Sequence, residues 1–150
     1  MSQYQRAQNI LGYAAFGAEA NLERVLQQAL FEGKRIFLPV LMADNHFEAR
    51  EYKKDIPLTE NSFGILEPKD GKLIKPEGLD LILVPGLVFD NRLHRIGFGA
   101  GYYDRYLLQA KNAFRLGAAY AFQIIHYFEE EPHDVRLDAI ASEMDVFYRV

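Results

Sequence analysis

Three largely apolar runs of five to seven residues lie in the first 84 positions of the chain. They cover Ile10–Phe16, Ile36–Val40 and Leu79–Val84, the last of which has Asp80 as its one charged residue; Gly17 follows the first run and Pro85 the last. A short run that is apolar at every position is typical of a strand covered on both faces, as in a parallel sheet. We therefore expect these three segments to form the centre of a sheet, with the second one ending at Pro39.

A helix is predicted between the first two strands. Asn21 is a suitable N-cap, and Gly33 follows the last apolar position, where a left-handed residue ends many helices. The apolar residues between them recur at helical spacing: Leu22, Val25, Leu26, Ala29 and Leu30. Strand, helix and strand joined by short connections form a βαβ unit, which predicts parallel pairing.

The remaining pattern completes an α/β arrangement. We expect helices at Ser2–Asn9 and Tyr103–Lys111, strands at His46–Tyr52, Leu116–Tyr120 and Met144–Val150, and a long ordered loop over Asp55–Gly78. Residues 123–131 fit neither pattern, and residues 133–138 predict a loop with one helical turn. The predicted fold is a single α/β domain over residues 1–150, a three-layer sandwich around a mostly parallel sheet.

Composition narrows the class of protein. The 150 residues are 49% hydrophobic and carry a net charge of −4, which fits a folded globular domain and gives no sign of a general nucleic-acid binder. The sequence has no cysteine, so disulfides, thiol nucleophiles and Cys-based zinc sites are excluded. No apolar run approaches roughly 20 residues, and because Met1–Asn9 is polar we expect no signal peptide. We expect a cytoplasmic protein that does not bind membranes.

The stretch from Val84 to Leu107 carries the most chemistry. After the strand and a polar turn come Arg95, glycines at three alternate positions, two tyrosines and Asp104. Glycines let backbone N–H groups converge on an anion, a helix N-terminus adds positive charge, and an arginine grips phosphate oxygens. An aspartate there can hold Mg²⁺. This pattern predicts a cradle for nucleotide phosphates.

The glycines alone, at Gly97, Gly99 and Gly101, would also fit a surface turn between a strand and a helix. Neither common phosphate motif matches, because the chain lacks G-x-x-x-x-G-K-[ST] and Tyr102 replaces the last glycine of G-x-G-x-x-G. The combination of arginine, glycines, tyrosines and aspartate favours the cradle.

The segments V-P-G-L-V-F-D and R-I-G-F-G-A-G-Y-Y-D-R-Y-L resemble the signature of the 5-formyltetrahydrofolate cyclo-ligase family, and S-F-G-I-L-E-P over residues 62–68 resembles a second family segment. The resemblance extends from Ile10 to the C-terminus. It implies conversion of 5-formyltetrahydrofolate and ATP to 5,10-methenyltetrahydrofolate, ADP and phosphate, with Mg²⁺ as cofactor. Ala100 departs from the glycine or lysine usual in the family.

The resemblance also implies roles for individual residues. Catalytic roles fall on Arg95, Tyr102 and Tyr103, and the metal ligands are Asp104 and Asp134. ATP contacts fall on Arg95, Ile96, Gly97, Phe98, Gly99, Ala100, Gly101, Tyr102 and Tyr103, and folate contacts on Ala14, Glu19, Phe98, Gly99 and Tyr102.

Taken without the family, several of these residues have simpler explanations. Glu19 and Asp134 fit solvated turn carboxylates, and Asp104 fits a favourable charge at a helix N-terminus. We interpret Glu67 as a turn residue before proline. The histidines lack metal spacing, so we expect His46, His94, His126 and His133 to be structural or exposed.

Family members usually begin with a helical segment whose lysine and arginine reach ATP, and this sequence begins after it. We therefore expect either a truncated start or a divergent relative with weakened or lost activity, and an apolar surface that favours self-association. A monomer or a homodimer fits. Two other functions stay open: a non-catalytic module that binds nucleotide or folate, and an α/β enzyme that handles sugar phosphates.

Overall fold

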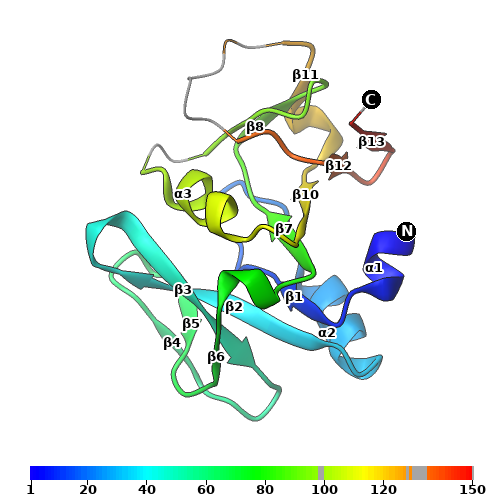
Figure 1. Cartoon of the computed structure of the whole chain (residues 1–150). Coiled ribbons are helices and arrows are strands. Elements are labelled where there is room, and N and C mark those ends of the chain that lie inside the picture. The colour runs from blue at the N-terminus through cyan, green and yellow to red at the C-terminus, as the bar shows by residue number, and fades with distance from the viewer. Residues whose placement is uncertain (98–99, 128, 130–134, 150) are drawn as a thin grey trace.

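The computed structural model describes residues 1–97, 100–127, 129 and 135–149. Within these residues the main sheet has eight strands (Figure 1). Their order across the sheet is β13 (Val146–Tyr148), β12 (Ala139–Ala141), β10 (Phe114–Ala118), β7 (Leu81–Val84), β1 (Asn9–Leu11), β2 (Arg35–Met42), β3 (His46–Tyr52) and β6 (Leu73–Ile74).

The centre of this sheet is parallel and its margins are antiparallel. Strands β12, β10, β7, β1 and β2 pair in parallel, whereas β13 at one margin and β3 and β6 at the other pair antiparallel. The predicted α/β fold around a mostly parallel sheet is confirmed, and so is the βαβ unit formed by β1, α2 (Glu23–Phe31) and β2. Gly33 ends α2 with φ +83°, as the sequence predicted.

Two apolar cores lie on the two faces of the sheet, which gives the three layers. Strand β7 shows the division most clearly, because Leu81 and Leu83 belong to the core with α2, and Ile82 and Val84 to the core with α3 (Tyr102–Gln109). Successive strand residues point to opposite faces, so a strand buried on both sides needs apolar residues at every position. Figure 1 shows α3 and the pair formed by α1 (Ser2–Arg6) and α2 on different sides of the sheet.

The segment predicted as a long loop, Asp55–Gly78, contains regular structure. It holds strands β4 (Leu58–Glu60) and β5 (Leu66–Pro68), which pair as a separate two-stranded hairpin, then β6 and the 3₁₀ turn η2 (Pro76–Gly78). Strands of two or three residues are too short for hydrophobic alternation to reveal them.

The other short elements lie in the connections after β2, β7 and β10. They are the 3₁₀ turns η1 (Ala43–Asn45) and η3 (Ala121–Gln123) and a three-stranded sheet of β11 (Ile124–Ile125), β8 (Val88–Asp90) and β9 (Arg95–Ile96). No helix in the described part of the chain is long and apolar enough to span a membrane.

The ends of β1 and β2 differ from the prediction. Strand β1 stops at Leu11, whereas β2 continues through Pro39 to Met42. The amide of Arg35 and the carbonyl of Phe37 face β1, and alternation along the strand points Pro39 the same way. Because β1 has already left β2 at this point, the missing N–H of Pro39 removes no ladder hydrogen bond.

Candidate active site

A cavity of about 730 Å³ lies beyond the carboxyl ends of β1, β2 and β7, the edge of a parallel sheet where ligands bind. Its walls come from four parts of the chain: the segment after β1, the ends of β2 and β7 with β3, the β4–β5 hairpin, and the turn from β9 into α3. The predicted site residues that line it are Ala14, Glu19, Arg95, Ile96, Gly97, Ala100, Gly101, Tyr102, Tyr103 and Asp104.

Arg95 lies on β9 beside the first glycine. Its Nη1 donates to the Pro85 carbonyl at 2.8 Å, and its guanidinium lies 5.3 Å from the ring centre of Tyr103. A Cβ atom at Gly97 would lie 2.7 Å from this Nη1 atom, closer than real contacts allow. Glycine at position 97 therefore leaves room for the arginine at the cavity wall.

The N-terminus of α3 opens onto the same cavity. Gly101 is its N-cap with φ +74°, a left-handed conformation that favours glycine. Tyr102, Tyr103 and Asp104 form the first turn and line the cavity. The unpaired N–H groups and dipole of a helix start attract anions.

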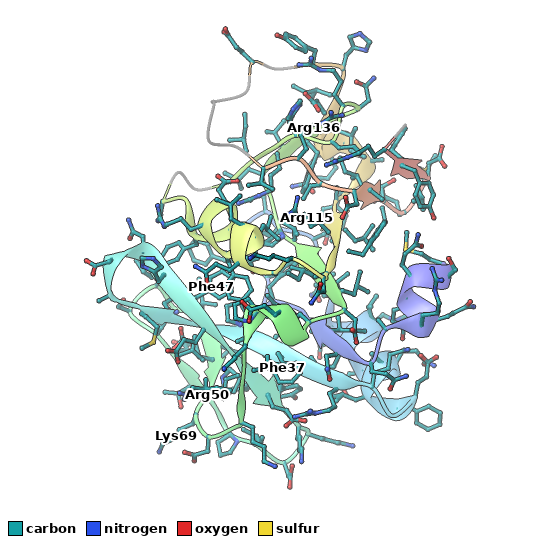
Figure 2. The ribbon with its side chains drawn as sticks, in the orientation of Figure 1. Phe37, Phe47, Arg50, Lys69, Arg115 and Arg136 are labelled. Atoms are coloured by element: carbon teal, nitrogen blue, oxygen red, sulfur yellow. The ribbon has the colours of Figure 1, made fainter. Side chains whose placement is uncertain are left out.

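Tyr103 is held by packing. Its ring lies 5.0 Å from that of Phe47, which in turn stacks on Tyr106 at 4.3 Å; Figure 2 shows Phe47 reaching from β3 toward α3. Burial raises the pKa of Tyr103 well above its usual value, so its hydroxyl, already neutral at pH 7, is even less prone to ionise.

Glu19 adds a carboxylate to the cavity lining. Its Oε1 accepts a hydrogen bond from the Phe16 amide at 2.8 Å. Burial raises the pKa of Glu19, while the Phe16 N–H and the positive charge of Arg95 lower it by smaller amounts. The cavity thus places a half-buried acid within electrostatic reach of a cation.

Of the two predicted metal ligands, the structure describes one. Asp104 lines the cavity, and its Oδ1 accepts a long hydrogen bond of 3.4 Å from the amide of Val135. Asp134 lies outside the described residues, as do Phe98 and Gly99. No group of three or more His, Asp or Glu side chains gathers around a common point in the ranges that the structure covers.

Sequence reasoning missed the wall opposite the glycine turn. It consists of the β4–β5 hairpin with the end of β2, and its lining residues are Pro39, Leu41, Asn61, Phe63, Ile65, Leu66 and Glu67. The interpretation of Glu67 as a turn residue was wrong, because Glu67 lies in β5 and accepts hydrogen bonds from Leu41 and Asn61. The family-like segment over residues 62–68 was the available signal.

The sequence of this chain is similar to those of known proteins. The sequence profile of the 5-formyltetrahydrofolate cyclo-ligase family matches residues 1–143. The chain belongs to the 5-formyltetrahydrofolate cyclo-ligase family. Its sequence is 32% identical over 141 residues to the 5-formyltetrahydrofolate cyclo-ligase of Haemophilus influenzae, covering 90% of this chain and 75% of that protein.

Solved structures in the family share the fold. The 5,10-methenyltetrahydrofolate synthetase of Aquifex aeolicus superposes with a TM-score of 0.87 at 30% identity, covering 99% of this chain and 75% of that one. The synthetase of Mycoplasma pneumoniae gives 0.71 at 26% identity, over 90% and 73%. The resemblance inferred from the glycine-rich signature is confirmed, and so is the inference of an enzyme family.

The described histidines of this cyclo-ligase family member stand apart from the cavity lining. His94 is buried, and its Nδ1 lies 3.3 Å from Oδ2 of buried Asp90, whereas His46 and His126 are exposed. These placements fit the structural or exposed roles expected of them. His133 lies outside the described residues.

Proposed function

We propose that this chain catalyses the ATP- and Mg²⁺-dependent conversion of 5-formyltetrahydrofolate to 5,10-methenyltetrahydrofolate, with release of ADP and phosphate. The family supplies the reaction class. The observation that carries the proposal is the single cavity that joins Arg95, the glycine turn and the α3 N-terminus to Glu19 and an apolar wall. Phosphates bind to an arginine, glycine backbone N–H groups and a helix N-terminus. A flat ring system with hydrogen-bond donors binds to a carboxylate and an apolar wall.

Arg95 and the turn into α3 form the phosphate end. We assign the ATP phosphates to the Arg95 guanidinium and to the backbone from Ile96 to Tyr103, with Phe98 and Gly99 retained as predicted contacts. The support is that Arg95 is half-buried, oriented by the Pro85 carbonyl, and adjacent to a helix start that faces the cavity. An oriented arginine stabilises the charge of a transferring phosphoryl group without having to reorganise.

Asp104 and Asp134 are the proposed Mg²⁺ ligands. Mg²⁺ takes oxygen ligands, one or two carboxylates with substrate phosphates, and Asp104 offers a carboxylate on the cavity wall. The contact of Asp104 with the Val135 amide, next in sequence to Asp134, supports the pairing. When bound, the ion would neutralise charge on the phosphates.

Glu19, Ala14 and Tyr102 form the proposed folate end. A carboxylate accepts hydrogen bonds from the amino and ring N–H groups of a pterin. Burial disfavours the charged form of Glu19, so N–H donors from a ligand would stabilise its carboxylate form.

The proposed reaction requires no covalent bond between the substrates and the protein. The formyl oxygen forms a bond to the γ-phosphorus as the bond to ADP breaks. N10 then bonds to the activated carbon and loses its proton, and phosphate leaves with the formyl oxygen. The residues of the chain orient these atoms and balance their charge.

The test is methenyl absorbance after addition of Mg-ATP and 5-formyltetrahydrofolate to the purified chain. Turnover that requires Mg²⁺, ATP and 5-formyltetrahydrofolate supports the proposal. Arg95→Ala should lower kcat/KM about 10- to 150-fold, the loss of a charged hydrogen bond. The matched control is Arg24→Ala, at an exposed arginine on α2. Ligand binding by the wild-type chain without turnover would instead support the non-catalytic module.

A further inference from the structure

We propose that Glu67 and Asn61 are positioning residues, which fix the β4–β5 hairpin as the far wall of the cavity and so determine how tightly the folate is held. This inference rests on the proposed function for its ligand, whereas the hairpin contacts stand on the structure alone. Neither residue was among the predicted site residues, and both line the cavity.

The first contact fills a gap at the edge of β2. Strand β1 pairs with β2 only as far as Phe37, so the alternate positions Pro39 and Leu41 face an edge that no described strand pairs with. Pro39 has no N–H to satisfy. The amide of Leu41 donates to Oε2 of Glu67 at 2.8 Å, so the glutamate takes the place of the missing strand.

The second contact links that carboxylate to the hairpin loop. Nδ2 of Asn61 donates to the same Glu67 oxygen at 2.9 Å, while its Oδ1 accepts from the amides of Phe63 at 2.8 Å and Ile65 at 3.1 Å. The loop reverses at Gly64, which has φ +79°. Both ends of the Asn61 side chain are therefore used, and they add to the backbone hydrogen bonds that close the loop, from Asn61 N to the Ile65 carbonyl and from Gly64 N to the Asn61 carbonyl.

The hairpin needs such contacts because it is a sheet of its own, with no ladder to the main sheet among the described strands. Its base is held by a hydrogen bond of 3.0 Å from Arg50 on β3 to the Lys69 carbonyl; Figure 2 labels both residues. Its cavity end carries Phe63, which is 58% exposed, and packing alone holds that end weakly. Glu67 thus supplies a hydrogen bond that links β2 to the part of the hairpin lining the cavity.

Two substitutions separate positioning from a direct charge contact. Glu67→Ala removes both acceptor interactions, whereas Glu67→Gln keeps a carbonyl oxygen for Leu41 and Asn61 but removes the charge. The matched control is Glu60→Ala, an exposed glutamate on β4 of the same hairpin. Asn61→Ala provides a second way to release the loop if Glu67→Ala does not fold.

Amide hydrogen exchange of the ligand-free protein is the first measurement. We expect the Leu41 amide to exchange about tenfold faster in Glu67→Ala than in wild type. The amides of Phe63 and Ile65 should exchange faster by a similar factor in Asn61→Ala. Exchange in Glu67→Gln and Glu60→Ala should match wild type. The second measurement is calorimetric Kd and steady-state KM for 5-formyltetrahydrofolate. Both should rise about tenfold or more in Glu67→Ala with little change in kcat or in KM for ATP, and recover in Glu67→Gln.

Unchanged exchange and unchanged folate affinity in Glu67→Ala would overturn the inference. A Glu67→Gln variant as weak as Glu67→Ala would also overturn it, because the negative charge itself would then be required. If the wild-type chain binds folate without turnover, the proposed reaction fails, yet the exchange rates and Kd still decide the role of Glu67. Absence of folate binding by wild type would refute the ligand-holding part.

Discussion

Two glycine-to-alanine substitutions should separate the function of the cavity from the stability of the fold. At Gly97 the added methyl would lie 2.7 Å from Nη1 of Arg95 and 3.3 Å from its Nη2. The clash is with the far end of a flexible side chain, so the guanidinium can move away and the fold survives. Moving it breaks the hydrogen bond to Pro85 that orients it.

The size of each effect follows from these contacts. A hydrogen bond to a charged group contributes about 1.5–3 kcal/mol, so a displaced Arg95 should lower kcat/KM for ATP about 10- to 150-fold. The stability change should stay within about 1 kcal/mol, because replacing glycine also restricts the unfolded chain.

Gly117 on β10 is the matched control. There the methyl would lie 2.7 Å from Leu137 Cδ1, 3.0 Å from Phe89 Cε1 and 3.3 Å from Ile140 Cγ1, all in the closed core. Overpacking of this kind costs about 1–3 kcal/mol, a fall in Tm of about 2–12 °C for a chain of this size. The remaining folded enzyme should keep its kcat/KM.

The assay pairs methenyl formation under varied ATP with thermal unfolding of the same preparations. Gly97→Ala should lose activity at nearly constant Tm, and Gly117→Ala should lose Tm at nearly constant activity. Wild-type kinetics in Gly97→Ala, with Arg95 still required in the Arg95→Ala variant, would show that the guanidinium position next to Gly97 is irrelevant to the reaction.

Two further predictions concern stability. The buried hydroxyl of Tyr106 has no hydrogen-bond partner among the described residues, so Tyr106→Phe should be neutral or stabilise by up to about 2 kcal/mol in urea unfolding; a clear loss would reveal a partner. Arg35 lowers the pKa of Glu51 below 4.5, so the stability that this pair contributes is present above about pH 4.5 and is lost as pH falls through the lowered pKa. Glu19 has a raised pKa, so its contribution to the free energy of unfolding is present below about pH 4.5 and is lost as pH rises through that pKa. Urea midpoints from about pH 3 to 7 should rise less steeply with pH in Glu51→Gln than in wild type, and more steeply in Glu19→Gln; parallel curves for all three proteins would contradict both shifts.

The sequence predicted the centre of the fold because its apolar pattern is strong there. Leu79–Val84 contains β7, and the helical spacing from Leu22 to Leu30 matches α2 almost to the residue. The glycine turn was also visible, since its residues are close in sequence and their chemistry is local. These are the features that periodicity and short motifs report.

The second wall of the cavity could not be predicted in the same way. Leu41 and Glu67 are 26 residues apart, and their hydrogen bond depends on where β1 leaves β2. Strands β4 and β5 have three residues each and expose much of their surface, so they carry no clear alternation. A glutamate before a proline resembles a turn until the tertiary structure gives it partners.

The departure of β1 from β2 explains why the site lies where it does. Beyond Leu11 the chain turns away at Gly12, where a Cβ atom would lie 2.6 Å from Leu26 on α2, and it then delivers Ala14 and Glu19 to the cavity. The same departure leaves the edge of β2 open, which makes a proline acceptable within the strand and gives the β4–β5 hairpin an amide to bind. The divergence of β1 from β2 therefore leaves space for the cavity and brings Glu19 to its lining. It also leaves the Leu41 amide available to bind the β4–β5 hairpin on the other side. For that reason, residues that hold the hairpin to β2 should affect folate binding by about as much as residues that touch the ligand, although they act through the position of the hairpin.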